Sequence, residues 1–359
     1  MTATYLPQLR PLSVAQLLDQ AVRLYRNNFL TFVGILAIVL IPLTILQLLI
    51  GGAMFAFTGN IFDPANISNV EDMDAVFIIG FLGIALTTIL SIVLIQGLAT
   101  AALTRAVASN FLGETIGIMD AYRLIGNSWL SLLLALFLSA IIAFGLFIWF
   151  LIPCVGWLTG LGILMFFGLV IVPLIAPIIV LEKQAASKSI RRSWDLSRRR
   201  FWPVFGFVLV LALFSYLIIG GPASLVTFVT QIAFADIFLS NPALQFILQT
   251  VLQSVVSLLG SLIFLPLQLT AYTLLYLDLR VRTEGLDLEI LANSLEDDQQ
   301  HSVSETFTAA PTSEKGNLVT MTEMGYFVLI ELGGLALYAL LVGALIALGV
   351  AFGAASGGF

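Results

Sequence analysis

Residues 189–203 read SIRRSWDLSRRRFWP, a dense group of basic residues between two apolar stretches. Guanidinium groups bind phosphate strongly because their N–H donors match its oxygens in pairs. A segment of this kind suits nucleic acid, a phosphate-bearing small molecule or the headgroups of a membrane. Its five arginines are Arg191, Arg192, Arg198, Arg199 and Arg200.

Residue types that usually carry catalysis or bind metal are scarce. Cys154 and His301 are the single cysteine and the single histidine, so a zinc site is not expected. The sequence has no phosphate-binding loop ending in lysine and no GxSxG nucleophile motif. The acidic stretch at 63–74 lacks the regular ligand spacing of a calcium loop. We therefore expect neither enzyme activity, nor a cofactor, nor a bound metal.

The composition is that of a membrane protein, since 60% of the 359 residues are hydrophobic and only 10% are charged. Runs such as LLLALFLSAIIAFGLFIWFLIP are apolar on every side, which predicts helices rather than membrane strands. Seven segments are long enough to cross about 30 Å of hydrocarbon. They are 30–57, 76–104, 129–152, 156–181, 202–230, 246–277 and 325–352.

The charges are distributed unevenly along the chain. The net charge of −6 argues against a general nucleic-acid binder. All fifteen lysines and arginines lie before the first apolar segment or in the second, fourth and sixth connections. By the positive-inside rule these parts are cytoplasmic, so the amino terminus is inside and the carboxyl terminus outside. The predicted location is the cytoplasmic (inner) membrane of a prokaryote.

The sequence also repeats itself ahead of three apolar segments. AVRLYRNNFL at 21–30 aligns with AYRLIGNSWL at 121–130, and SWDLSRRRFW at 193–202 is a weaker third copy. Apolar residues share one helical face in these stretches, with arginines opposite. We expect amphipathic helices at the membrane surface. Their predicted positions are near 12–28, 114–127 and 184–200.

These patterns predict an all-α fold, a polytopic transmembrane helical bundle. Its six core helices form three units, each an amphipathic helix followed by a membrane hairpin, and together they occupy residues 1–291. Residues 292–322 are polar and acidic, too poor in apolar residues to fold alone, and are expected to be a flexible linker. The linker tethers a seventh membrane helix at 323–359.

Three stretches resemble the membrane-domain family of glycerophosphoryl diester phosphodiesterases. They are LSVAQLLDQAVRLYRNNFLTF, VPLIAPIIVLEKQAASKSIRRSWDLSRRRFWPVFG and LLYLDLRVRTEGLDLEI, within residues 10–292. In that family the membrane domain stands alone or accompanies a separate catalytic domain that uses histidines and acidic metal ligands. This chain has one histidine, His301, inside the polar linker, so the resemblance implies a membrane domain without a catalytic one. The linker and the seventh helix depart from the family pattern.

The arginines of the amphipathic stretches are predicted to contact lipid headgroups and to set the topology. Helical spacing spreads them over an exposed face, and anionic headgroups on the cytoplasmic side attract such a face. A docking surface for another protein and a phosphate site remain alternatives. The predicted contact residues are Arg23, Arg26, Arg123, Arg191, Arg192, Arg198, Arg199 and Arg200.

Polar residues and prolines inside the apolar segments form a second set of candidates. Polar side chains at this depth either join helices or line a path. The candidates for an intramembrane polar path are Gln96, Gln249, Gln253 and Gln268. The residues expected to shape helix packing are Pro173, Pro177, Gly349 and Gly353.

Two functions fit the sequence. The first is a non-catalytic integral membrane protein, a scaffold or an accessory subunit, in which the seventh helix binds a membrane-protein partner or a second copy of the chain. The alternative is a transporter or lipid-handling protein with a path between the helical repeats, which the four glutamines and the Pro173/Pro177 pair suggest. Membrane lipids are expected partners in either case, and nucleic acid is not.

Overall fold

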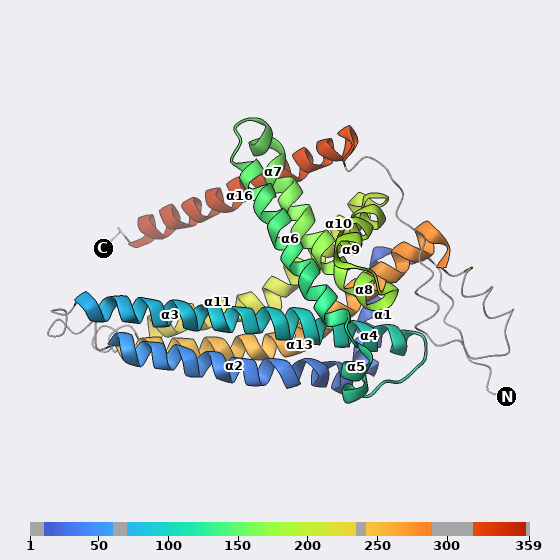
Figure 1. The fold of residues 1–359 in the computed structure, drawn as a ribbon. Helices are drawn as coiled ribbons and strands as arrows, with labels where there is room; N and C mark the ends of the chain where they lie inside the picture. The colour runs from blue at the N-terminus through green and yellow to red at the C-terminus, as the bar shows by residue number, and fades with distance from the viewer. Residues whose placement is uncertain (1–10, 60–69, 235–241, 287, 289–318, 357–359) are drawn as a thin grey trace.

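The computed structural model describes residues 11–59, 70–234, 242–286, 288 and 319–356. Throughout this part of the chain the regular secondary structure is helical, and seven helical stretches are long and apolar enough to cross a membrane. The predicted class, an all-α polytopic helical bundle, is confirmed (Figure 1). The spans are Phe29–Ala53, Gly80–Phe111, Ser128–Phe150, Val155–Glu182, Phe201–Ala233, Ile247–Glu284 and Met321–Leu340.

Six of the spans form three successive hairpins. The first hairpin consists of α2 (Phe29–Gly59), α3 (Val70–Ser91), η1 (Ile92–Ala99) and α4 (Thr100–Phe111). The second consists of α6 (Ser128–Phe150), α7 (Val155–Phe166), η2 (Phe167–Ile171) and α8 (Val172–Glu182). The third consists of α10 (Phe201–Ser215), η3 (Tyr216–Gly220), α11 (Gly221–Ala233) and α13 (Pro242–Glu284).

Each hairpin contains one π-helical segment, a widened turn within a spanning helix. Proline has no N–H to donate to the preceding turn, which favours such a break. Pro173 and Pro222 each stand in the first turn of the helix that follows a π-helical segment, η2 and η3 respectively. In η1 no proline is involved, and the Thr100 hydroxyl instead donates to the carbonyl of Ile95. Pro177, the other predicted packing residue of this region, is buried inside α8.

A short helix precedes each hairpin, at the three positions predicted from the sequence. These helices are α1 (Val14–Asn27), α5 (Ile118–Leu124) and α9 (Ala186–Arg198). α1 begins with a capping box in which Ser13 and Gln16 satisfy each other's backbone N–H groups. The relation between the three copies as a sequence repeat stays a prediction.

The hairpins share a packed core at one end of the molecule. The span on α13, Ile247–Glu284, has 38 residues and is about 57 Å long, against about 30 Å of hydrocarbon. A helix of this length exceeds the hydrocarbon thickness, and α13 packs against α1, α4, α8 and α9. We call this packed region the core end. Its buried residues include Ala21, Leu103, Ile178, Leu196 and Tyr276.

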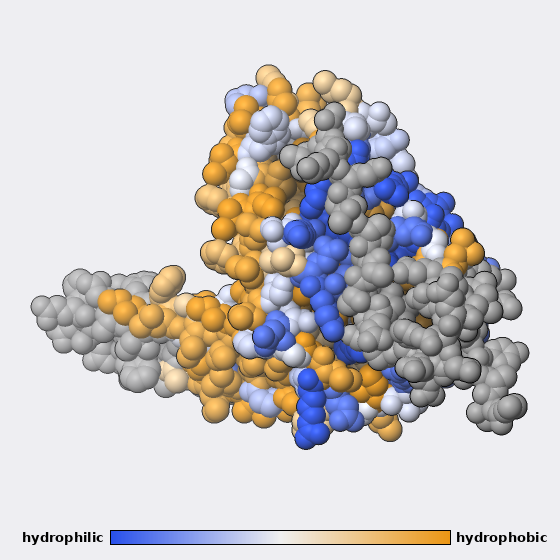
Figure 2. Space-filling model, turned by 45° about the vertical axis from the view of Figure 1, so that its right-hand side comes forward, coloured by the Kyte–Doolittle hydropathy of each residue, from blue (hydrophilic) through white to orange (hydrophobic). Residues whose placement is uncertain are grey.

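The hairpins diverge from the core end. In Figure 1, α2 and α3 run with α13 in one direction, while α6 and α7 run in another. Figure 2 brings the core end forward: hydrophilic residues gather there, whereas apolar residues cover the projecting helices. The fold thus combines a polar, well-packed end with arms suited to contact lipid.

The seventh span, α16 (Met321–Ser356), packs against α7 of its own chain. Thr320 and Glu323 form a capping box at its start, and Glu323 also pairs with Arg198 on α9 at 3.0 Å. α16 begins two residues before the predicted boundary of 323. The predicted linker lies outside the described residues as far as residue 318, and so do the side-chain surroundings of Gly349 and Gly353.

Candidate functional site

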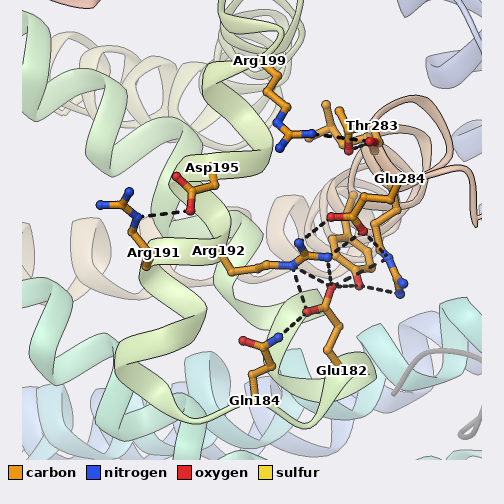
Figure 3. Close-up of polar contacts among 11 residues, drawn as sticks. Glu182, Gln184, Arg191, Arg192, Asp195, Arg199, Thr283 and Glu284 are labelled. Carbon is orange, nitrogen blue, oxygen red and sulfur yellow. Dashed lines mark hydrogen bonds and ion pairs between the residues drawn. The ribbon is translucent and has the colours of Figure 1, made fainter. Parts of the chain in front are cut away.

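The core end contains a buried network of charged residues centred on Arg192 (Figure 3). Its guanidinium reaches Glu182, at the end of α8, through Nε (3.1 Å to Oε2) and Nη2 (3.2 Å to Oε1). Nη2 also donates to Oε2 of Glu284 on α13 at 2.6 Å. One arginine on α9 therefore joins the ends of two spanning helices through charge-assisted hydrogen bonds.

Two further side chains of α13 complete this network. The Tyr276 hydroxyl donates to Oε1 of Glu182 at 2.7 Å, and Nε of Arg280 donates to Oε2 of Glu284 at 3.1 Å. The side chains of Arg280 and Glu182 are fully buried. Two arginines thus pair with two glutamates, and this pairing offsets the cost of burying four charged side chains.

The network holds its central arginine in the charged form. Burial by itself lowers the pKa of Arg192, but the hydrogen bonds and negative charges of Glu284 and Glu182 outweigh that effect and raise it. The guanidinium stays protonated at every physiological pH. Because its guanidinium stays charged and binds carboxylates from two helices, Arg192 suits a structural clamp between α8, α9 and α13.

For Arg192 the prediction of a headgroup contact is therefore wrong, because only 4% of the residue is exposed. Its helical face also carries Ser189, Ser193 and Leu196, all buried. Small serines let α9 approach its neighbours closely, and the Ser193 hydroxyl donates to the carbonyl of Ile171 at the end of η2. In the sequence, the position of Arg192 on the same helical face as these small residues was the pattern that indicated its burial.

The other predicted headgroup arginines differ in their surroundings. Arg23, Arg26, Arg123 and Arg199 are exposed, and for them the predicted lipid contact stays a prediction. Arg191 and Arg200 are half-buried, as is Arg198, whose pairing with Glu323 connects it to α16.

Two tyrosines connect the short helices to the spans. The Tyr25 hydroxyl of α1 donates to the carbonyl of Ile263 on α13 at 2.8 Å. The Tyr122 hydroxyl of α5 donates to the carbonyl of Ile35 on α2 at 2.6 Å. Burial raises the pKa of each tyrosine to about 12. Both hydroxyls therefore stay protonated and act as hydrogen-bond donors.

A second candidate site is a polar groove between α2, η1 and α13. Its volume is about 400 Å³. Gln47 and Gln253 are exposed while the hydroxyl residues are half-buried, so the groove opens on the surface of the spanning region. No charged residue is among those that line it. The polar residues are Thr44, Gln47, Thr250, Gln253, Ser254, Ser257 and Ser261.

The groove lies within the membrane-spanning part, in the half far from the core end. Thr44 is fifteen residues after Phe29, where the first span starts, which corresponds to about 22 Å along α2. The Gln47 amide donates to the Ser91 hydroxyl at 3.1 Å, so part of the polar lining is already hydrogen-bonded within the protein. The Thr44 hydroxyl likewise donates to the carbonyl of Leu40 at 2.8 Å. Hydroxyl oxygens that donate within a helix can still accept hydrogen bonds, so the lining can bind water, a neutral solute or a lipid headgroup.

The structure brings one of the four predicted glutamines, Gln253, into this groove. Gln96 is exposed and is not part of the lining, and the Gln268 amide donates to the Tyr272 hydroxyl at 3.2 Å. The Nε2 atom of Gln249 is buried without a hydrogen-bond partner in the described ranges. Gln96 and Gln268 do not line this groove, and the predicted path through them stays a prediction.

Sequence reasoning missed the hydroxyl residues of the groove. Thr250, Ser254, Ser257 and Ser261 follow one another at intervals of three or four, which places them on one face of α13. The signal was present in the sequence, but single serines in apolar helices are common because their hydroxyls bond to the preceding turn.

Seven spans that meet in a polar core end define a multi-pass α-helical membrane protein. The chain belongs to the family described as "Domain of unknown function (DUF7847)", which matches residues 12–279. No curated protein and no solved structure matches the chain. The matched region includes the polar groove and Arg192, whereas α16 lies beyond it. The resemblance to membrane domains of glycerophosphoryl diester phosphodiesterases stays a prediction.

Proposed function

We propose that this protein handles membrane lipids and that the polar groove is a path for their headgroups. The observation that carries this proposal is a groove of hydroxyl and amide groups that opens on the surface of a membrane-spanning region. A polar group placed in hydrocarbon without hydrogen bonds costs roughly 2–7 kcal/mol. A headgroup in the groove keeps hydrogen bonds while its acyl chains remain in the bilayer.

The lining favours a particular kind of headgroup. The groove offers neutral donors and acceptors and no charged residue among those described. It therefore suits zwitterionic or uncharged headgroups, whose own charges are balanced, over strongly anionic ones. Fixed carboxylates or ammonium groups, which would support ion-coupled transport, do not line it.

A lipid-scrambling assay tests the proposal. The full-length protein is reconstituted in phosphatidylcholine vesicles with a trace of fluorescent phosphatidylcholine, and dithionite bleaches the outer leaflet. We expect bleaching to extend to the inner-leaflet lipid only in vesicles with the protein. Replacing Ser254, Ser257 and Ser261 together by alanine should slow this transfer, whereas Ser224→Ala, an exposed serine on α11, should not.

Two results would contradict the proposal. One is bleaching in wild-type vesicles no greater than in protein-free vesicles, with circular dichroism showing a folded protein. The other is transfer that the triple alanine variant leaves unchanged, which would place any path elsewhere.

The scaffold hypothesis ranks second because of where α16 lies. That hypothesis expected the seventh helix to recruit a partner, but the first turns of α16 already pack on α7 and α9 through Phe327 and Glu323. A stoichiometric protein partner after purification in mild detergent, together with absent lipid transfer, would reverse the ranking.

We also propose that the core end faces the cytoplasm, with the amino terminus inside and the carboxyl terminus outside. The basic helix α9 and the basic end of α13 both belong to the core end. The positive-inside rule then sets the orientation of all seven spans.

A further inference from the structure

We propose a second lipid site: a pocket that holds one acyl chain of an anionic phospholipid, with the lipid phosphate at Arg191. The site does not rest on the proposed headgroup path, since it lies between α6, α7, η2, α9 and the start of α16, away from the polar groove. Its volume is about 420 Å³, within the range of ligand pockets.

The pocket is apolar along two spanning helices. α6 contributes Leu138, Ile142 and Leu146, which are four residues apart and therefore share one face over about 12 Å. The facing wall is formed by Ile163 and Phe166 of α7 and by η2. Apolar walls of this length, within spans that face the bilayer, match an acyl chain.

Polar groups are confined to the α9 side of the pocket. Ser187 and Arg191 line this side, and exposed Lys188 lies between them in the sequence. Arg191 is held by Asp195, whose carboxylate accepts from Nε at 3.1 Å (Figure 3). That pairing fixes the arginine at the pocket, where guanidinium N–H groups suit a phosphate.

Trp194 adds a polar group beside the pocket. Its indole ring lines the pocket, and its N–H is buried with no hydrogen-bond partner in the part of the chain that the structure describes. A buried donor without an acceptor is unfavourable, and a turn of the indole toward the pocket would let it donate to an ester or phosphate oxygen of a bound lipid. An acyl chain, an ester group and a phosphate therefore match the apolar wall, the indole and the arginine in turn.

α16 completes the site. Phe327 forms part of the pocket wall and contacts both Phe166 and Trp194, with ring centroids 5.9 and 6.2 Å apart. Without α16 the pocket would lack this wall. The docking of the seventh helix and the binding of the lipid are thus expected to support each other.

Native mass spectrometry of the delipidated full-length protein tests this site. Phosphatidylglycerol and phosphatidylcholine with the same acyl chains are added separately. We expect one tightly retained phosphatidylglycerol in the wild type. Arg191→Gln should weaken phosphatidylglycerol binding about fivefold, which is the effect of one basic residue near an anionic surface. It should also reduce the preference for phosphatidylglycerol over phosphatidylcholine. Lys183→Gln, which changes an exposed lysine outside the lining, should leave phosphatidylglycerol binding unchanged.

A second pair of variants tests the acyl-chain part. Ile142→Trp fills the pocket and should abolish retention of both lipids, whereas Ile141→Trp, on the exposed side of the same turn, should not. Circular dichroism checks folding in each case. The proposal is overturned if folded wild-type protein retains no lipid, if Ile142→Trp retains it fully, or if phosphatidylcholine binds as well as phosphatidylglycerol.

Discussion

At the scale of single residues, Arg192 is the most consequential side chain of the core end. It binds Glu182 and Glu284, two carboxylates on different helices, and has almost no exposure to solvent. Removing one member of a buried ionic group leaves its partners charged and without compensation, which is far more destabilising than losing a surface pair.

We therefore expect Arg192→Gln to lower the free energy of unfolding by about 3–5 kcal/mol. The exposed Arg199 provides the matched control, since Arg199→Gln should change the free energy of unfolding by less than about 0.5 kcal/mol. Denaturant unfolding in mixed micelles, followed by circular dichroism, measures both. Equal stability of the two variants would show that the network contributes little.

Tyr25 makes stability depend on pH in the alkaline range. Its folded pKa is raised from 10.0 to about 12, so the unfolded chain releases the proton first. Its contribution is complete below pH 10 and is lost as the pH rises from 10 to 12. Tyr25→Phe also lacks the hydrogen bond to Ile263, so we expect a protein less stable at pH 8 by about 1 kcal/mol.

The same unfolding measurement at several pH values tests this expectation. The difference in the free energy of unfolding between the wild type and Tyr25→Phe should shrink above pH 10, because the variant lacks the hydroxyl that titrates there. A difference that stays constant from pH 8 to pH 12 would mean that Tyr25 titrates normally.

At the scale of helices, the sequence predicted the elements much better than their packing. All seven spans and the three short helices lie where hydropathy and helical spacing placed them. The inward face of Arg192 and the polar groove depend on pairs far apart in the chain, such as Thr44 with Ser254, which periodicity within one helix does not reveal. The π-helical turns also escaped prediction, although two of them are followed closely by a proline.

The docking of α16 on α7 depends on one glycine. A Cβ atom added to Gly162 would stand 2.1 Å from the backbone oxygen of Phe327, so neither helix can relax by a side-chain rotation. We expect Gly162→Ala to displace the first turns of α16. Faster hydrogen–deuterium exchange around Phe327 would report this displacement.

Gly168→Ala is the control for that experiment, because a Cβ at Gly168 meets nothing within 4 Å. Exchange around Phe327 should be the same in this variant as in the wild type. If Gly162→Ala matched the control, the close approach of the two helices would not hold in solution. If it exchanged faster but still retained phosphatidylglycerol, the proposed role of α16 in the lipid pocket would be wrong.

At the scale of the whole molecule, the two proposed lipid sites lie at different depths. The acyl-chain pocket meets α9 at the core end, whereas Thr44 in the polar groove lies about 22 Å along the first span. A lipid bound at Arg191 and a headgroup in the groove would therefore occupy separate positions across the bilayer. The proposed anionic-lipid site requires the core end to face the cytoplasm, where anionic lipids and the basic residues attract each other.

The single cysteine of the chain makes that orientation directly testable. Cys154 is exposed in the turn between α6 and α7, at the opposite end of the second hairpin from Glu182. If the core end is cytoplasmic, a membrane-impermeant maleimide should label Cys154 in intact cells with a permeable outer envelope. Arg199→Cys in a Cys154→Ser background should be labelled only after the membrane is opened, since Arg199 lies on the basic side. Labelling in the reverse order would invert the topology and place the arginines, and with them the anionic-lipid site, on the outer surface.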